Sequence, residues 1–386
     1  MFLIIPLFLV LFTFVDFKYS QYPYIGESIL LGIYFIYSAV NTKRAVARVL
    51  FYNLAVFLIC CGLLEAGASM VHGYPGRYSG TWYSDARNYI SDDILGNAPK
   101  KNIKVSNIKY YDNKLVYDVI YTINKDGLRV SPPCVGSGCK DAILFFGCSY
   151  TFGEGLNDDE TMPFLVGEHA SGKVYNFGFS GYGPHQMLSA IDHGLVKKIV
   201  EGTPKYAIFQ TAAFHIIRAK GDLPWDQHAP KYILAKNGII KYAGHFDDSL
   251  IVRFRNYLLK CSSIYTNFIE WRQSNSRRRE NRKDIDRYIA IVVAARDELQ
   301  RRFPGLEFDI IYWNDWSGGN GTEQDREIIE RFREDGIKVY LISDILPGIN
   351  TYPNLFSIPL DGHPSYYANK RLANYITQNI LQNHAQ

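Results

Sequence analysis

The sequence has almost no excess of charge of either sign. Its 386 residues include 42 lysines and arginines against 38 aspartates and glutamates, a formal net charge of +4. Domains that bind nucleic acid concentrate positive charge on one face, so the composition predicts no nucleic-acid partner. Internal repeats and low-complexity tracts are also missing. The length instead fits one large or two ordinary domains together with a membrane anchor.

Cysteine is sparse as well, with six residues in the whole chain. No second cysteine or histidine pair has the spacing of zinc ligands, and the sequence predicts neither a metal nor another cofactor. Cys134 and Cys139 bracket a short Val-Gly-Ser-Gly loop. A disulfide between them would be consistent with an oxidising compartment.

Three apolar runs fill most of the first 68 residues. Met1–Val15 carries no charge, Tyr24–Val40 carries only Glu27, and Val49–Ala68 carries only Glu65. A spanning helix needs about 20 apolar residues, so residues 1–68 are predicted to be a membrane anchor with two to three transmembrane helices. Buried core helices are the alternative. A cleaved signal peptide is not indicated, because no basic residue precedes the first run and no small-residue site ends it.

The loops between these runs predict the orientation of a multi-pass membrane protein. Lys43, Arg44 and Arg48 cluster between the second and third runs, whereas Lys18 stands alone between the first and second. Loops rich in lysine and arginine stay in the cytoplasm. The chain after Ala68 is therefore expected on the periplasmic or extracellular side of the lipid bilayer.

The rest of the chain divides into two predicted parts. Residues 69–140 read as a linker and a small β-rich segment, in which apolar and polar residues alternate on both sides of Asp112-Asn113, a hairpin pattern. From residue 141 to residue 386, strands and helices alternate, apart from an insertion near 216–281. Such alternation predicts an α/β fold with a mostly parallel sheet that is covered on both faces. The predicted strands are Ala142–Phe146, Lys173–Phe177, Tyr206–Gln210, Glu307–Tyr312 and Lys338–Ile342, and the predicted helices are Glu160–Ala170, Pro184–Val200, Arg282–Phe303, Glu323–Asp335 and Tyr366–Gln382.

A serine stands where this fold class places its chemistry. The first predicted strand ends at Gly147, and Ser149 follows in a turn flanked by glycines. A serine hydroxyl needs a nearby base to act as a nucleophile. The segment Asp361-Gly-His363-Pro, just before the last predicted helix, offers His363 as the base and Asp361 as the carboxylate that orients it.

A second glycine-rich turn offers donors for an oxyanion. Residues 174–183 read Val-Tyr-Asn-Phe-Gly-Phe-Ser-Gly-Tyr-Gly and run from a predicted strand into a predicted helix. Turns of this kind aim backbone N–H groups outward, and glycine lets a substrate approach closely.

Taken together, these blocks resemble the SGNH/GDSL hydrolase superfamily over about residues 142–382. Gly147-Cys148-Ser149 is similar to the family's Gly-Asp-Ser block, with cysteine in place of aspartate. Asn176-Phe-Gly-Phe-Ser-Gly181 is similar to the second block, and Asp361-Gly-His363 to the closing block, with its aspartate two residues before the histidine instead of three. The resemblance implies a three-layer α/β/α fold and an oxyanion site made by the backbone N–H groups of Ser149 and Gly181.

The family's third block is missing. Its asparagine should follow the strand Tyr206–Gln210, where this chain reads Thr-Ala-Ala-Phe-His215. A ring nitrogen of His215 could donate to the oxyanion instead. The alternative is a structural histidine at the end of the strand.

The sequence therefore predicts a membrane-anchored, outward-facing serine esterase that hydrolyses O-acyl esters, with a glycan as one candidate substrate. An O-acyltransferase acting on an envelope or extracellular polysaccharide remains open, because hydrolysis and transfer share one acyl-enzyme. A non-catalytic SGNH-like domain that binds glycan or serves as a scaffold also remains open, since the third block is missing.

Overall fold

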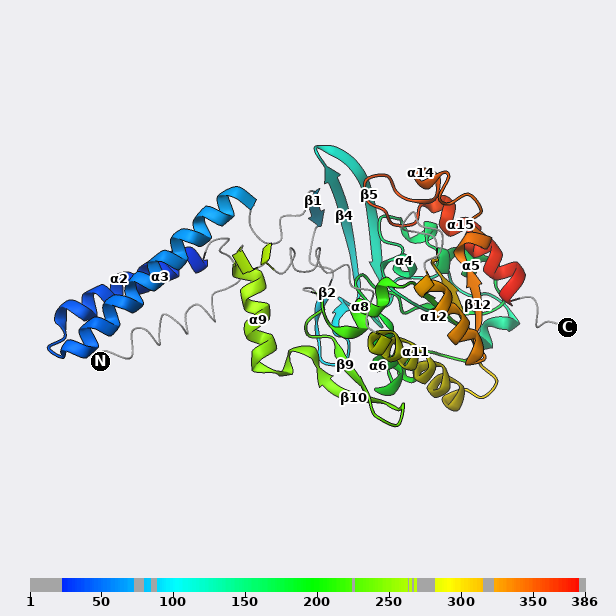
Figure 1. Cartoon of the computed structure of the whole chain (residues 1–386). Coiled ribbons are helices and arrows are strands. Elements are labelled where there is room, and N and C mark those ends of the chain that lie inside the picture. Colours follow the sequence, from blue (N-terminus) through cyan, green and yellow to red (C-terminus); the bar gives the residue numbers. More distant parts are fainter. Residues whose placement is uncertain are drawn as a thin grey trace. The chain divides into compact units, whose positions relative to one another are not determined.

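The computed structural model of the protein describes residues 23–72, 80–84, 89–223, 226–262, 264–265, 267–268, 282–314 and 323–381. The chain forms two compact units. The first contains residues 1–78 and 249–279, and the second contains residues 79–248 and 280–386 (Figure 1). The predicted span Met1–Val15 lies outside the described residues.

The second unit is built on a five-stranded sheet of the order β12-β11-β8-β6-β7, in which every neighbouring pair is parallel. The strands are β6 (Asp141–Phe146), β7 (Lys173–Asn176), β8 (Thr203–Thr211), β11 (Glu307–Tyr312) and β12 (Lys338–Leu341). All five lie where the buried apolar runs predict them. Because strand side chains alternate between the two faces of a sheet, each run supplies two cores.

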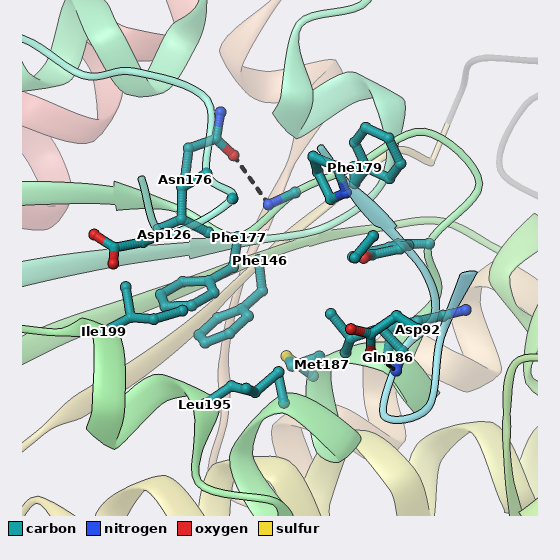
Figure 2. Close-up of a pocket in the computed structure, with 18 of the residues that line it drawn as sticks. Asp92, Asp126, Phe146, Asn176, Phe177, Phe179, Gln186, Met187, Leu195 and Ile199 are labelled. Carbon is teal, nitrogen blue, oxygen red and sulfur yellow. Dashed lines mark hydrogen bonds between the residues drawn. The ribbon is translucent and has the colours of Figure 1, made fainter. Parts of the chain in front are cut away.

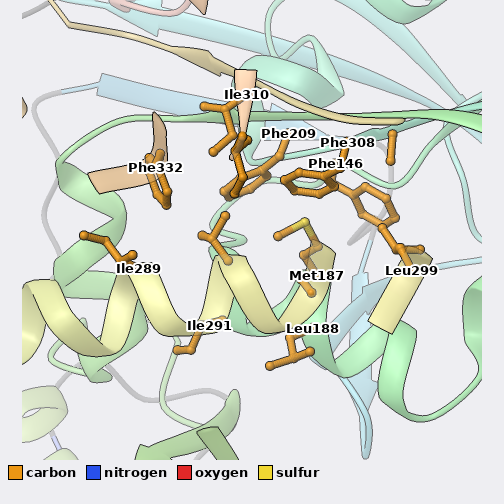
Figure 3. Packing of buried hydrophobic residues seen from close by; sticks show 14 of the residues in the cluster. Phe146, Met187, Leu188, Phe209, Ile289, Ile291, Leu299, Phe308, Ile310 and Phe332 are labelled. Carbon is orange, nitrogen blue, oxygen red and sulfur yellow. The ribbon is translucent and has the colours of Figure 1, made fainter. Parts of the chain in front are cut away.

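Helices cover both faces, so the predicted α/β fold is confirmed in three layers. Phe146 and Leu144 of β6 pack with one helical layer, whereas Phe145 and Ile143 pack with the other. Figure 3 shows the first of these cores, where Phe146, Phe209 and Ile310 of the sheet meet Met187, Ile289 and Leu299 of the helices. This layer contains α6 (Pro184–Asp192), α7 (Leu195–Ile199), α8 (Phe214–Lys220), α11 (Arg282–Arg302) and α12 (Glu323–Glu334). The other contains α5 (Met162–His169), α13 (Ile342–Ile345), α14 (Pro353–Phe356) and α15 (Tyr366–Tyr375), which continues as the π-helix η4 (Ile376–Leu381).

The predicted hairpin is present ahead of this sheet. Strands β4 (Ile103–Tyr111) and β5 (Lys114–Ile123) pair antiparallel, and β1 (Gly80–Ser84) pairs with β4. Asp112 and Asn113 both have positive φ, 46° and 61°. Two central residues of this kind match the twist of a hairpin, which explains why Asp-Asn marks the turn.

Smaller elements complete the second unit. Strands β2 (Tyr89–Asp92) and β3 (Gly96–Pro99) form a second hairpin, and β9 (Pro230–Leu234) with β10 (Ile240–His245) a third. The third lies in the segment predicted as a partly helical insertion, so that the insertion also contains strands. Cys134 and Cys139 form the predicted disulfide, with their Cα atoms 5.6 Å apart.

The first unit contains α2 (Pro23–Asn41), α3 (Ala45–His72) and α9 (Leu250–Cys261). Helices α2 and α3 pack closely at Gly32, where a Cβ atom would lie 2.6 Å from the side chain of Ile59. Glu65 of α3 is 1% exposed, and its carboxylate accepts a 2.8 Å hydrogen bond from Ser262 Oγ after α9.

The predicted number of spans needs correction. Among the described residues, only the stretch Ala45–Ala68 of α3 is long and apolar enough to cross a membrane. The apolar part of α2 is Ser28–Asn41, which is shorter than a span. The described part of the chain therefore supports one candidate span and not a multi-pass arrangement.

Candidate active site

The turn after β6 presents Ser149 at the carboxyl edge of the sheet. Gly147 has φ +154°, and a Cβ atom there would lie 2.1 Å from Thr151 Oγ1, so that only glycine fits. Ser149 is the first residue of the one-turn helix α4 (Ser149–Phe152). Cys148, at the position of the family's aspartate, is buried and has a free thiol.

The structure brings the three predicted catalytic side chains together. His363 Nε2 lies 2.9 Å from Ser149 Oγ, although 214 residues separate the two in the chain. His363 Nδ1 lies 2.5 Å from Asp361 Oδ1, which also accepts the His363 backbone N–H at 3.0 Å. Gly362, with φ +90°, bends the chain so that an aspartate two residues before the histidine still reaches the ring.

Asp361 is held from its other side by a lysine that the sequence did not single out. Lys109 Nζ of β4 donates a 2.7 Å hydrogen bond to Asp361 Oδ2, and the carboxylate is fully buried. Burial raises the pKa of this carboxyl group, but the hydrogen bonds and positive charges of His363 and Lys109 outweigh it and lower the pKa to about 2. Asp361 is therefore ionised over the working range of an esterase.

A second carboxylate lies beside the imidazole. Glu154 Oε2 lies 3.8 Å from His363 Nε2, and Ser180 Oγ donates a 2.6 Å hydrogen bond to the same oxygen. Burial lowers the pKa of His363, but the negative charges of Glu154 and Asp361 reverse this effect and raise its pKa above the ordinary value. The ring of Tyr150 meets the imidazole edge-on at 5.6 Å.

Arg129 supports the loop that carries Glu154. This side chain is 1% exposed, and its guanidinium donates to the carbonyl oxygens of Phe152 at 2.8 Å, Gly153 at 2.6 Å and Leu156 at 2.5 Å. Its Nε also donates to Asp158 Oδ1 at 3.0 Å. The carboxylate of Asp158 thus forms an ion pair with the buried guanidinium of Arg129.

The segment with Gly181 is fixed from several sides. The N–H of Gly178 donates to Asn176 Oδ1 at 3.0 Å, as Figure 2 shows, and Gly181 has φ +85°. Arg218 Nη1 donates to the carbonyl oxygen of Tyr182 at 2.6 Å. In the part of the chain that the structure describes, the backbone N–H groups of Gly181 and Ser149 have no hydrogen-bond acceptor.

The structure places His215 away from the predicted role of oxyanion donor. Its ring is fully buried, with Nδ1 2.9 Å from Thr211 Oγ1 and Nε2 3.4 Å from Arg218 Nη1. It also stacks on Phe209 in the sheet. Burial, followed by the charge of Arg218, lowers the pKa of His215 well below its ordinary value. The ring is thus a neutral part of the core, as in the structural alternative.

A pocket adjoins the same loops. Figure 2 shows the rings of Phe146 and Phe177, which stack at 5.1 Å, above Met187 and Leu195. Gly147 also lines this pocket, whereas Ser149, Asp361 and His363 do not. The pocket therefore adjoins the backbone of the nucleophile turn and is separate from the catalytic side chains. Among the described residues, no group of three or more His, Cys, Asp or Glu side chains is placed to hold a metal ion.

Comparisons with known proteins give similarity in structure alone. No family model and no curated protein matches the sequence. Similar solved structures include a protein assigned to the G-D-S-L lipolytic family from Desulfitobacterium hafniense DCB-2, with 14% identity, a TM-score of 0.32, and 62% of this chain and 98% of that chain covered. A carbohydrate esterase family 2 enzyme from Corynascus thermopiles is 11% identical, with a TM-score of 0.33 and coverage of 71% and 75%. An acetyl xylan esterase from the rumen bacterium Butyrivibrio proteoclasticus is 10% identical, with a TM-score of 0.33 and coverage of 70% and 66%.

The three-layer fold and the contact between Ser149, His363 and Asp361 are those that the resemblance to SGNH/GDSL hydrolases implies. What the site can do is inferred below from its own geometry.

Proposed function

We propose that the protein is a membrane-anchored serine esterase of SGNH/GDSL type that hydrolyses O-acyl esters. The observation that carries the proposal is the hydrogen-bonded series Ser149, His363 and Asp361 at the carboxyl edge of the sheet. A serine, a histidine and a buried carboxylate in this order are the groups that acyl transfer needs. Helix α3 is the candidate anchor.

The mechanism follows from the positions of these atoms. Ser149 Oγ attacks the acyl carbonyl carbon while His363 Nε2 takes the hydroxyl proton. Asp361 stabilises the imidazolium that forms on the Nδ1 side. The free backbone N–H groups of Ser149 and Gly181 are the proposed donors to the oxyanion. His363 then gives its proton to the leaving alcohol, and a water molecule, activated by the same base, releases the acid and restores Ser149.

The substrate class is proposed to be a glycan O-acyl ester outside the cytoplasm. This part follows from the resemblance, whose membrane-tethered members act on extracytoplasmic polysaccharides, lipids or small esters, and from the basic cluster Lys43–Arg48 ahead of most of α3. The Cys134–Cys139 disulfide is compatible with such a compartment.

A fluorophosphonate probe tests the proposal directly, because labelling requires an activated serine. The full chain in detergent should be labelled and should hydrolyse a short-chain aryl ester. Ser149→Ala and His363→Ala should each abolish both signals, and the double variant should be no worse than either one, because the two residues act as a unit. Ser91→Ala, at an exposed serine of β2, is the matched control and should behave as wild type.

Wild-type protein that neither takes the probe nor cleaves esters would refute the enzymatic assignment and favour a glycan-binding or scaffold role.

If the protein is active, a panel of acetylated oligosaccharides would define its substrate. Transfer of the acyl group to an added sugar in place of water would identify an acyltransferase that uses the same site.

A further inference from the structure

The catalytic imidazole lies between two buried carboxylates that are not equivalent. Asp361 meets its Nδ1 side and Glu154 its Nε2 side. Both are buried, since the Asp361 side chain is 0% exposed and Glu154 is 7% exposed. A carboxylate in such surroundings acts strongly on a neighbouring charge, because little water screens it.

The two carboxylates differ in what else neutralises them. Asp361 shares its charge with Lys109 at 2.7 Å. Glu154 accepts the neutral hydroxyl of Ser180, and among the described residues it forms no ion pair with a lysine or an arginine. Arg129 also interacts with Glu154 electrostatically, but without an ion pair, so the charge of Glu154 is neutralised less directly than that of Asp361.

Resting on the esterase function proposed above, we propose that Glu154 is a positioning residue that stabilises the protonated form of His363 from its Nε2 side. The effect matters at two moments. In the free protein, Glu154 favours a protonated and inactive base at low pH. In the transition state, the same charge stabilises the imidazolium that forms when His363 takes the proton of Ser149.

The remaining groups that face this carboxylate are accounted for. Tyr121 accepts the backbone N–H of Gly155 and Tyr117 lies against the same glycine, next to Glu154. Burial raises the pKa of both tyrosines, so both stay neutral in the pH range of interest. Arg129 lies against Tyr121 at 4.5 Å, and its donors point to the loop carbonyls and Asp158. Neither the tyrosines nor Arg129 changes charge while His363 titrates.

Lys109 has the opposite electrostatic effect on His363. Its positive charge, held at Asp361, works against the protonation of His363, whereas Glu154 favours it. Removing the glutamate charge and removing the lysine charge should thus move the titration of His363 in opposite directions. If both residues had only a structural role, the two variants would not shift the titration in opposite directions.

The experiment measures the pH dependence of kcat/KM for a neutral aryl ester, which reports the ionisation of the free enzyme's base. Glu154→Gln keeps an acceptor for Ser180 and should move the acid limb to lower pH. Its kcat at high pH should fall, but by less than the roughly 10²- to 10⁴-fold that loss of general base catalysis costs. Lys109→Met should move the limb to higher pH, and Lys109→Arg should restore the wild-type position.

Two controls separate charge from structure. Ser180→Ala removes the hydrogen bond to Glu154 but no charge, and should leave the limb in place. Glu201→Gln removes a distant, exposed carboxylate that pairs with Lys173, and should also leave it in place. An unmoved limb in Glu154→Gln, or a shift of both charge variants in the same direction, would overturn the proposal.

An NMR titration of histidine labelled at Cε1, assigned with His363→Gln, measures the same protonation without any substrate. A shift of this resonance to lower pH in Glu154→Gln supports the proposal even in a protein that cleaves no ester. The same midpoint in wild type and variant refutes it. If only the esterase assignment fails, the midpoint of His363 should still shift in Glu154→Gln, but the wild-type protein should not be labelled by the fluorophosphonate.

Discussion

Replacing Arg129 should reduce the stability of the second unit more than any single surface change. Arg129→Met keeps most of the aliphatic stem but removes four hydrogen bonds, to the carbonyl oxygens of Phe152, Gly153 and Leu156 and to Asp158. These partners stay buried around the vacated guanidinium. A buried acceptor that loses its donor costs about 1–3 kcal/mol, and breaking one side of a buried ion pair costs about 3–5 kcal/mol.

The side chain of Asp158 is 19% exposed and can turn towards water, so the two costs do not add in full. We expect a loss of about 3–5 kcal/mol in the free energy of unfolding. For a unit of this size, each kcal/mol lowers Tm by about 2–4 °C. The drop should therefore be on the order of 10 °C, measured by differential scanning fluorimetry of the full chain in detergent.

Arg301→Met is the matched control. Arg301 is 69% exposed and pairs with Glu298 on the surface of α11, so its loss should leave the free energy of unfolding almost unchanged. Arg129→Lys should fall between the two, because one ammonium group cannot reach all the acceptors that the guanidinium fork reaches. If Arg129→Met unfolds within about 1 kcal/mol of wild type, the idea that these contacts hold the loop is wrong.

Three further outcomes are expected. His215→Ala should lower Tm while kcat of the folded enzyme stays near the wild-type value, since the ring packs in the core; a 10²-fold fall in kcat at unchanged Tm would return His215 to the catalytic site. Asp361, whose pKa is lowered to about 2 in the folded protein, should contribute about 2 kcal/mol of stability above pH 4 that is lost as the pH falls towards 2; Asp361→Asn should flatten this part of the stability curve in acid denaturation. Mass spectrometry of unreduced peptides should recover Cys134 and Cys139 as a linked pair, and two free thiols would contradict the bond.

The sheet could be predicted from the sequence because its strands are short, buried and apolar on both faces. Short, continuous apolar runs such as Ala142–Phe146 are typical of parallel strands that are buried on both faces. The three proposed catalytic side chains could also be found from the sequence, because each belongs to a short local pattern. Gly147-Cys148-Ser149 marks the nucleophile turn, and Asp361-Gly-His363 brings the acid and the base together.

The supporting residues could not be found in the same way. Lys109 lies 252 residues from Asp361 in the chain, and nothing in its own strand distinguishes it from other lysines. Arg129 and Glu154 likewise acquire their roles only when the hairpin and the nucleophile loop pack together. Contacts of this kind are set by the tertiary fold and leave no local pattern.

The buried placement of the His215 ring, which differs from the predicted one, has a specific cause. Its position after β8 correctly placed it at the carboxyl edge of the sheet, but position does not determine the direction of a side chain. The Thr211 hydroxyl forms a hydrogen bond with the hydroxyl of Tyr288 in α11. His215, four residues later, forms a hydrogen bond with the same Thr211 hydroxyl. The ring thus follows Thr211 into the core on the α11 side.

The order in which the two compact units alternate along the chain bears on how the protein could be shed from a membrane. The polypeptide passes between the units three times, near residues 78, 248 and 279. One proteolytic cut at the first passage would leave residues 249–279 joined to the second unit while the bond between Ser262 and Glu65 still ties that segment to α3. Release of the second unit would require cleavage at all three passages, so a single nick should leave it joined to the proposed anchor α3.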